Sequence, residues 1–274
     1  MEIKILERSE NSLRFILTDS SPAFANALRR IMISEVPSMA IDDVFFYENQ
    51  SALDDETIAH RLGLIPLKTD LDSYVLPEEC ECKSETGCNR CRTVITLGAE
   101  AEDSARTVYS GDLKPEDPDI IPVSPQIPVV KLVPGQKIKL EAYAKLGTAK
   151  QHAKWQPVSA CAYKYLPVID INQKACDACR ECIEACPKKV LSLKDGKVAV
   201  VDLLACTLCM ECIKRCHTKP PAIEVEGDAT AFIFYVETTG TLPAERLVTQ
   251  AVKILIDEIE EFVKEVKGAG RGSS

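Results

Sequence analysis

Cysteine is the residue type with the clearest chemical meaning in this sequence, because most of the thirteen cysteines fall into regular runs. Eight of them form two runs of the same spacing, C-x2-C-x2-C-x3-C, displaced by 30 residues: Cys176, Cys179, Cys182 and Cys186, then Cys206, Cys209, Cys212 and Cys216. Closely spaced thiolates of this pattern are typical ligands of [4Fe–4S] clusters, and the fourth cysteine of each run then binds the other cluster. The predicted ligand sets are Cys176, Cys179, Cys182 and Cys216 for the first cluster and Cys206, Cys209, Cys212 and Cys186 for the second.

Zinc and disulfides are the alternatives for these eight cysteines. A zinc site needs only four ligands, usually with a longer separation between pairs, so two identical runs favour iron–sulfur clusters. Between the runs, two short apolar stretches flank Asp195-Gly196, and this dipeptide predicts a β-hairpin. The repeat is imperfect at one place, because His217 follows the second run where Pro187 follows the first.

A second group of four cysteines has a different spacing, C-x-C-x5-C-x2-C, formed by Cys80, Cys82, Cys88 and Cys91. Four thiolates within twelve residues are enough for a tetrahedral structural zinc site. Two disulfides, or reduced thiols in a mobile loop, are the alternatives. The remaining Cys161 lies between two alanines and is predicted to be a buried core thiol.

The composition is that of an ordinary globular protein, with 274 residues, 46% hydrophobic and 27% charged. The net charge of −9 argues against a chain that grips a nucleic-acid backbone by itself, since such binding needs a basic surface. No stretch is long and apolar enough for a membrane span, and residues 1–5 do not look like a signal peptide. We therefore expect a cytoplasmic protein, in which thiols stay reduced and available as ligands.

The elements that must position the cysteines follow an α+β pattern. Residues 3–17 alternate as one or two strands, and Ser21-Pro22 is typical of a helix start. That helix should end before Pro37. Residues 41–165 are strand-like and rich in turns, and residues 231–236 predict a buried strand.

A long helix is predicted from about Pro243 to Gly268, followed by a flexible tail over residues 268–274. Its apolar residues recur every three or four positions: Leu247, Ala251, Ile254, Leu255, Ile259, Phe262 and Val266. The opposite face is acidic. This stripe fits an ordinary core helix, but it is wider than one small domain usually buries, and a subunit interface is the second interpretation.

Several motifs resemble those of the alpha-like subunits of multisubunit RNA polymerases, in the branch of that family shared by archaea and eukaryotes. The motifs are Asn26-Ala27-Leu28-Arg29-Arg30-Ile31 with Glu35-Val36-Pro37 and Ala40-Ile41-Asp42, then His60-Arg61-Leu62-Gly63-Leu64-Ile65-Pro66, and finally His152-Ala153-Lys154-Trp155-Gln156-Pro157. The loop from Cys80 to Cys91 is similar to the zinc loop of the eukaryotic third-largest subunit. The resemblance covers nearly the whole chain.

This resemblance implies a fold and its division into domains. A discontinuous dimerisation domain would combine residues 1–40 with residues 222–267. A mostly β insert domain would span 41–165 and carry the four-Cys loop, and a ferredoxin-like domain with both clusters would span 166–221. Residues 268–274 would remain a tail.

The resemblance also implies partners. The two helices would pack against the smaller subunit L, and subunits N and P and the two large catalytic subunits would bind to the resulting heterodimer. Nucleic acid would be reached only through the complex, and no membrane is involved. The implied interface residues are Phe24, Leu28, Arg29, Arg30, Ile31, Leu247, Ala251, Ile254, Leu255, Ile259 and Phe262. Without the resemblance, Arg29 and Arg30 would be ordinary solvated helix residues.

The sequence thus predicts a non-catalytic assembly subunit of a DNA-directed RNA polymerase whose clusters stabilise or regulate assembly. No catalytic residues are expected, because the acidic groups, such as Asp54-Asp55-Glu56 and Glu116-Asp117-Pro118-Asp119, lie in turn-like contexts and do not form the convergent carboxylates of two-metal nucleotidyl transfer. The alternative is a ferredoxin-like electron-transfer protein with an appended interaction domain. A flavin, dinucleotide or haem motif, which would favour that alternative, was not found in the sequence.

Overall fold

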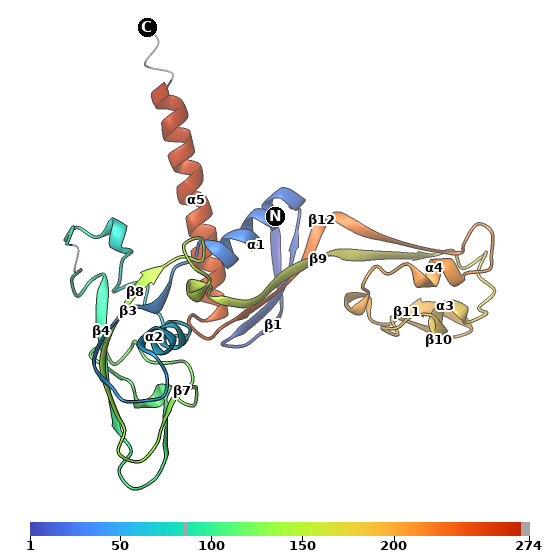
Figure 1. Ribbon diagram of the computed structural model, residues 1–274. Helices are drawn as coiled ribbons and strands as arrows, with labels where there is room; N and C mark the ends of the chain where they lie inside the picture. The colour runs from blue at the N-terminus through green and yellow to red at the C-terminus, as the bar shows by residue number, and fades with distance from the viewer. Residues whose placement is uncertain (85–86, 270–274) are drawn as a thin grey trace. The chain divides into compact units, whose positions relative to one another are not determined.

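The protein folds into two compact units (Figure 1), each assembled from segments that are far apart in the sequence. The computed structural model describes residues 1–84 and 87–269. Unit 1 comprises residues 1–7, 14–26 and 162–235. Unit 2 comprises residues 8–13, 27–161 and the chain from 236 onward.

One four-stranded sheet has the order β1-β2-β12-β9. Its strands are β1 (Glu2–Arg8), β2 (Ser12–Thr18), β9 (Val158–Ile171) and β12 (Ile223–Thr238). Aromatic rings pack on this sheet within unit 1: Phe15 stacks on Phe234 at 4.9 Å between ring centroids, and Tyr163 meets Phe232 edge-on at 5.5 Å. The predicted strand at residues 231–236 is confirmed, but β12 is much longer than that prediction.

The first helix, α1 (Pro22–Ser34), begins and ends where the sequence predicts. The hydroxyl of Ser21 accepts a hydrogen bond of 3.3 Å from the backbone N–H of Phe24, which satisfies one of the free N–H groups of the first turn. The helix ends three residues before Pro37, in agreement with the restriction that proline places on the preceding backbone.

The Cys-rich module, residues 172–222, lies between β9 and β12. It contains the short helices α3 (Glu181–Glu184) and α4 (Glu211–Arg215), the 3-10 turn η4 (Leu203–Ala205) and the strands β10 (Leu191–Lys194) and β11 (Lys197–Val200). The predicted hairpin is confirmed, because β10 and β11 pair antiparallel around Asp195 and Gly196. Both turn residues have positive φ, 50° and 77°, as a two-residue hairpin turn of this kind requires.

Unit 2 contains a four-stranded sheet of order β3-β8-β4-β6 and a two-stranded sheet of β5 with β7, in which the paired strands are antiparallel. Its elements are β3 (Ser38–Asn49), α2 (Asp55–Gly63), η1 (Pro77–Glu79), β4 (Arg92–Glu100), β5 (Arg106–Tyr109), η2 (Ser110–Asp112), β6 (Lys114–Pro115), β7 (Pro128–Leu132), β8 (Lys137–Gly147) and η3 (Ala153–Trp155). One large apolar core lies between the sheets and α2.

Helix α2 is a finding that the sequence did not predict. Asp54, Asp55 and Glu56 were expected in a turn-like region, yet Asp55 and Glu56 form the first turn of this helix. Acidic residues at a helix start interact favourably with its free N–H groups. Only Ile58 and Leu62 bury an apolar side chain against the core, which is too short a pattern for a periodicity argument.

The last helix, α5 (Ala244–Ala269), includes Gly268 and so continues slightly beyond its predicted end. The rest of the predicted tail, residues 270–274, lies outside the described residues. Within the described part of the chain, no helix combines the length and the apolar character that crossing a membrane would demand.

Candidate metal centres

The two cysteine runs of the Cys-rich module have the same backbone conformation as well as the same spacing. Ala178 and Arg180 in the first run have φ of 60° and 73°, and Leu208 and Met210, 30 residues later, have φ of 56° and 62°. Residues other than glycine rarely adopt this left-handed backbone conformation, and they do so mainly where the surroundings or a ligand require it. Alternation between right- and left-handed residues turns successive N–H groups toward one point, which creates a site for a negatively charged group.

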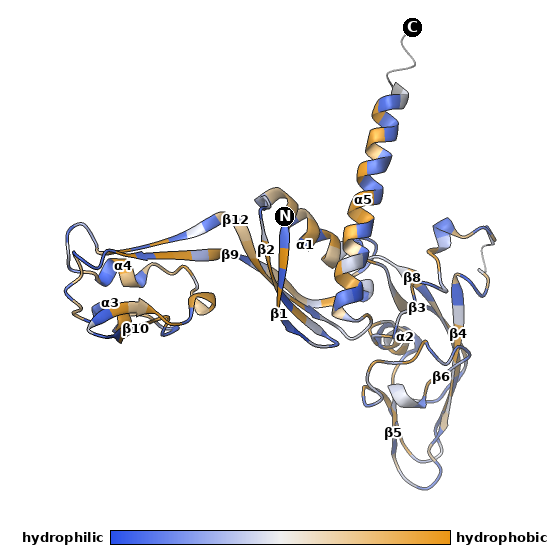
Figure 2. Ribbon diagram, turned by 180° about the vertical axis from the view of Figure 1, so that it is seen from behind, coloured by the Kyte–Doolittle hydropathy of each residue, from blue (hydrophilic) through white to orange (hydrophobic). Residues whose placement is uncertain are grey.

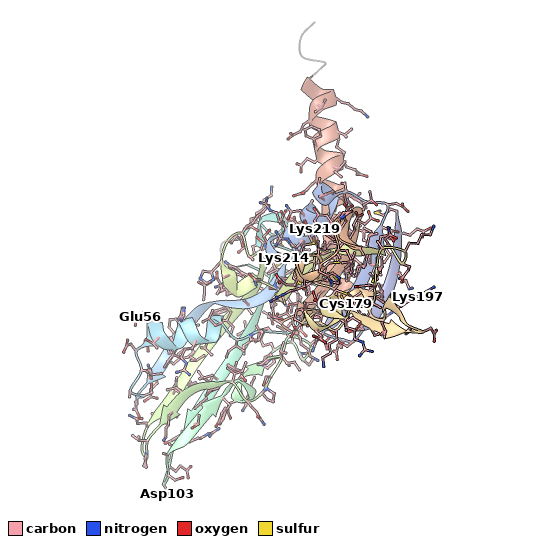
Figure 3. The ribbon with its side chains drawn as sticks, turned by 90° about the vertical axis from the view of Figure 1, so that its right-hand side faces the viewer. Glu56, Asp103, Cys179, Lys197, Lys214 and Lys219 are labelled. Carbon is pink, nitrogen blue, oxygen red and sulfur yellow. The ribbon has the colours of Figure 1, made fainter. Side chains whose placement is uncertain are left out.

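The eight cysteines surround two cavities of equal size, each with about 370 Å³ of space that holds no protein atom, counting the part open to solvent. The first cavity is lined by Cys176, Cys179, Cys182 and Cys216, and the second by Cys186, Cys206, Cys209 and Cys212. Each cavity therefore takes three cysteines from one run and the fourth from the other run. Figure 3 labels Cys179 on this module, together with Lys197, Lys214 and Lys219.

Backbone N–H groups point at cysteine sulfurs in both cavities. The N–H of Ala222 lies 3.3 Å from Sγ of Cys216, and the N–H of Val190 lies 3.4 Å from Sγ of Cys186. Burial acts against the Cys216 thiolate, but donation from the Thr218 hydroxyl and from backbone N–H groups outweighs it and lowers the pKa. Sulfurs that receive such hydrogen bonds suit an anionic metal–sulfur group.

The first cavity also contains a thiol whose ionisation is disfavoured. Burial, followed by the neighbouring cysteine sulfurs, raises the pKa of Cys182 to about 11. A group that carries metal ions would displace this proton, because cysteine binds metals as the thiolate. In the part of the chain that the structure describes, no three of the eight sulfurs lie within 4.8 Å of one another. The sulfurs around each cavity are therefore spaced more widely than the ligands of a single-ion site, although Cys179 lies within 4.8 Å of ligand atoms of Asp177 and His217.

The four-Cys loop brings its sulfurs into contact. Sγ of Cys80 lies 3.6 Å from Sγ of Cys88, and Sγ of Cys91 lies 3.9 Å from those of Cys82 and Cys88. Four sulfurs at the usual zinc–sulfur distance of about 2.3 Å form a tetrahedron with edges of about 3.8 Å. A disulfide would need sulfurs about 2.05 Å apart, and all thirteen cysteines, each within the described residues, are free thiols. This loop is a group of residues that could bind a metal ion.

The thiols of this loop share their protons unequally. The backbone N–H of Cys82 favours the thiolate of Cys80, but hydrogen bonds with other thiols and burial outweigh it and raise the pKa of Cys80 to about 12. The N–H of Arg90, and then the thiol of Cys80, lower the pKa of Cys88 to about 7. Cys88 is therefore the thiol of this loop that ionises most easily, and a bound cation would displace the protons of the others.

Cys161 lies apart from both groups. It is half-buried, whereas the sequence predicted a buried core thiol, and its Sγ lies 3.9 Å from the carbonyl oxygen of Arg29. Burial raises the pKa of Cys161 to about 12, so this thiol stays protonated.

Residues from all three sequence motifs meet in one polar cluster of unit 2. Nζ of Lys154 donates to one carboxylate oxygen of Asp42, and Nζ of Lys145 lies 2.5 Å from the other. The indole N–H of Trp155 donates to the carbonyl oxygen of Lys145 at 3.2 Å, and a Cβ on Gly63 would lie 3.8 Å from Lys154. Burial would raise the pKa of Asp42, but the hydrogen bonds from both lysines outweigh it and lower the pKa. Sequence reasoning missed this cluster, because its members are up to 112 residues apart.

Two motif histidines remain on the surface. His60 and His152 are both exposed, and Nδ1 of His152 accepts a hydrogen bond of 3.0 Å from the backbone N–H of Lys154. Trp155, in contrast, is 5% exposed and belongs to the interior. None of these three side chains lines either of the two cavities of the Cys-rich module.

The predicted interface residues divide into buried and exposed sets. Buried within the chain are Leu28, Ile31, Leu247 and Ala251. Half-buried are Phe24, Arg29, Ile254 and Leu255, and exposed are Arg30, Ile259 and Phe262. The side chains available to a partner on α5 are therefore those of its second half.

The second half of α5 exposes an apolar stripe. Its members are Ile256, Ile259, Phe262, Val263 and Val266, which are 51%, 55%, 66%, 40% and 56% exposed. Figure 2 shows hydrophobic residues recurring along this helix. We call these five residues the α5 stripe. Several large apolar side chains in a row on one helix face are typical of a surface that another protein covers.

Comparison with known proteins gives consistent results along the whole chain. Residues 14–259 match the family model of the RNA polymerase Rpb3/Rpb11 dimerisation domain. The chain is 46% identical over 263 residues to DNA-directed RNA polymerase subunit Rpo3 of Archaeoglobus fulgidus, which covers 96% of this chain and 97% of that protein. It is 44% identical to Rpo3 of Methanothermobacter thermautotrophicus, with 98% and 100% covered, and 40% identical to Rpo3 of Pyrococcus furiosus, with 97% of each covered.

Proposed function

Because this chain belongs to the RNA polymerase Rpb3/Rpb11 dimerisation family, we propose that it is the Rpo3 subunit of an archaeal DNA-directed RNA polymerase. In this role it assembles other subunits and contributes no catalytic residue. The observation that carries the proposal is the similarity to Rpo3 proteins over almost the full length of the chain.

The proposed partner of the dimerisation domain is the small subunit L, and the α5 stripe supports this assignment. Burying large apolar side chains against a partner stabilises a complex by about 25 cal/mol per Å² of apolar surface. Subunits N and P and the two large catalytic subunits would bind the resulting heterodimer. Exposed Arg30 of α1 is available for such a contact.

The domain division that we propose follows the family. Residues 1–40 and 222–267 would form the dimerisation domain, residues 41–165 the insert domain, and residues 166–221 a ferredoxin-like domain. The insert domain would carry the four-Cys loop, in which four sulfurs within 4.8 Å of one another support a zinc ion.

The ferredoxin-like domain would hold two [4Fe–4S] clusters. The first would bind Cys176, Cys179, Cys182 and Cys216, and the second Cys206, Cys209, Cys212 and Cys186. Two cavities lined by these sets, with N–H groups directed at their sulfurs, support the assignment. When bound, each cluster joins the two runs through iron–sulfur bonds, so its binding free energy becomes folding free energy of this domain. Cluster loss would then loosen the domain and weaken assembly.

The proposed function is tested by forming the heterodimer with the small subunit. We expect Phe262→Asp, which places a charge in the α5 stripe, to weaken binding by at least about 2 kcal/mol, or about 30-fold. The measurement is the dissociation constant from titration of the purified chain with subunit L.

Glu260→Ala is the matched control, because Glu260 is exposed on the same helix but outside the α5 stripe. It should change binding less than about twofold, and both variants should unfold at the temperature of the unmodified chain. A chain that stays monomeric in the presence of subunit L, or nucleotide incorporation by the isolated chain, would refute the proposed function.

A further inference from the structure

Lys164 of β9 reaches into the loop that begins the second cysteine run. Its ammonium group donates hydrogen bonds of 2.6 Å to the carbonyl oxygens of both Leu204 and Cys206. Cys206 is the first cysteine of that run and lines the second cavity. The lysine comes from outside the Cys-rich module, so it connects the sheet strand directly to a residue whose sulfur faces the cavity.

The loop also packs against strands β9 and β12. A Cβ on Gly227 of β12 would lie 2.8 Å from Cβ of Tyr165 and 3.3 Å from Cδ1 of Leu208. Only glycine at this position leaves room for Tyr165 and Leu208 to approach the strand. Leu208 lies between the first two cysteines of the second run, so both a polar contact and an apolar contact fix this loop on β9 and β12.

The two cavities differ in the charge around them. Apart from the cysteines, Lys188 is the one residue with a charged side chain among the described residues that line the second cavity. The first cavity is lined by both Asp177 and Arg180, and Asp177 lies 3.0 Å from Nε2 of His217. Lys164 adds a second positive charge and Asp202, which interacts with this ammonium, adds a negative one, so with Lys188 the surroundings of the second cavity remain more positive than the Asp177 and Arg180 pair of the first.

We propose that Lys164 is a positioning residue for the cluster of the second cavity and that its charge gives this cluster the higher reduction potential of the two. The inference rests on the proposed iron–sulfur content of the module. A positive charge near a cluster favours the reduced form, since reduction adds one negative charge, and net charge and hydrogen bonding are among the factors that set cluster potentials. The same ammonium fixes the carbonyl groups of the ligand loop, so its removal affects one cluster only.

The test is a potentiometric titration of the full-length chain, purified without oxygen. Dithionite dissociates at its S–S bond into two sulfur dioxide radical anions, each of which gives one electron to a cluster and is oxidised to sulfite. No bond of the cluster is formed or broken, and the reduced clusters are counted by electron paramagnetic resonance. Cys209→Ser identifies the signal of the second cavity by its loss. In Lys164→Met we expect the ratio of reduced to oxidised cluster at a fixed potential to fall about tenfold for that signal alone. This change corresponds to about 59 mV for a one-electron couple.

Lys194→Met is the matched control, because it removes the same charge from the exposed end of the hairpin and should leave both potentials unchanged. Lys164→Arg keeps the charge and should retain most of the difference between the clusters. If Lys164→Met binds only half the iron while the control binds all of it, the specific role of Lys164 at one cluster is supported. Unchanged potentials with full iron in Lys164→Met, or equal effects on both clusters, would overturn this inference alone. An unmodified chain without iron and sulfide would overturn the proposed cofactors as well.

Discussion

The four-Cys loop and the Cys-rich module use the same residue type in two different ways. In the loop, all four sulfurs lie within 4.8 Å of one another, whereas among the described residues no three of the module's eight sulfurs do. Sulfurs in contact leave room for one ion at their centre, and sulfurs spaced around a cavity leave room for a larger group. Both regions have left-handed residues between their cysteines, Lys83 and Gly87 in the loop and Ala178 and Leu208 in the module, so the different spacing of the sulfurs follows from the different cysteine spacing in the sequence.

The two regions also differ in how much apolar core surrounds them. Among the described residues, the core of unit 2, to which the loop is attached, contains twenty-two buried residues, whereas the core under the module contains five, of which Cys182, Leu191 and Val198 belong to the module and Ile223 and Val225 to β12. A small apolar core cannot offset the conformational entropy of ordering about fifty residues. We therefore expect metal binding to decide whether the module folds, and to adjust only a local loop in unit 2.

The largest expected effect is the loss of one cluster through a single cysteine. Cys216→Ser should abolish the cluster of the first cavity and not that of the second, because Cys216 lines the first cavity although it belongs to the second run. A structural metal site contributes on the order of 10 kcal/mol to folding, so residues 172–222 should become sensitive to protease. The measurements are iron content, cluster signals and limited proteolysis.

The pairing between runs makes this prediction specific. Cys176→Ser should remove the same cluster signal as Cys216→Ser, and Cys206→Ser should remove the other. Cys161→Ser, outside both cavities, serves as the control and should keep all the iron. If Cys216→Ser instead resembles Cys206→Ser, each run binds its own cluster and the crossed assignment is wrong.

A smaller effect is expected in the four-Cys loop. Cys88→Ser should release one zinc ion, leave the iron content unchanged and lower the free energy of unfolding of unit 2 by about 1–3 kcal/mol, the range of an ordinary single substitution. The large core should keep β3, β4 and β8 folded. Zinc and iron quantitation with chemical unfolding measures this result, and complete unfolding of unit 2 after zinc loss would show that the two regions do not differ as we infer.

Local sequence signals predicted the parts of the Cys-rich module that depend on neighbouring residues. The Asp195-Gly196 turn supplies its own backbone preference, and the 30-residue repeat of the cysteines identified which four line each cavity. Helix α1 could be predicted equally well, since Ser21 and Pro22 mark its start. Each of these features is determined by residues a few positions apart or by a repeat that the sequence shows directly.

Contacts between distant segments could not be predicted in this way. The hydrogen bond from Lys164 to Cys206 spans 42 residues, and that from Lys154 to Asp42 spans 112. The sequence around a lysine in a strand does not show whether its ammonium group is solvated or donates hydrogen bonds to a carbonyl group. The left-handed backbone at Ala178 and Leu208 was also hidden, because neither position carries the glycine that normally marks it.

The smallest effects are expected when one glycine in each region is replaced by alanine. Gly196 in the hairpin of the module has φ of 77°, a conformation that costs alanine about 1 kcal/mol. Gly196→Ala should therefore leave the clusters in place but accelerate iron release to a chelator several-fold, because the small core has little else to hold the hairpin. The rate of iron release measures this, and an unchanged rate would mean that the clusters alone determine the module's stability.

Gly98 of β4 is the counterpart in unit 2, where a Cβ would meet no atom within 4 Å and φ is not positive. Gly98→Ala should stabilise unit 2 by up to about 1 kcal/mol, since alanine restricts the unfolded chain more than glycine does. It should leave iron release unchanged. If both substitutions alter iron release equally, the module's stability depends on unit 2, and the separation between a region folded by its core and a region folded by its metal would not hold.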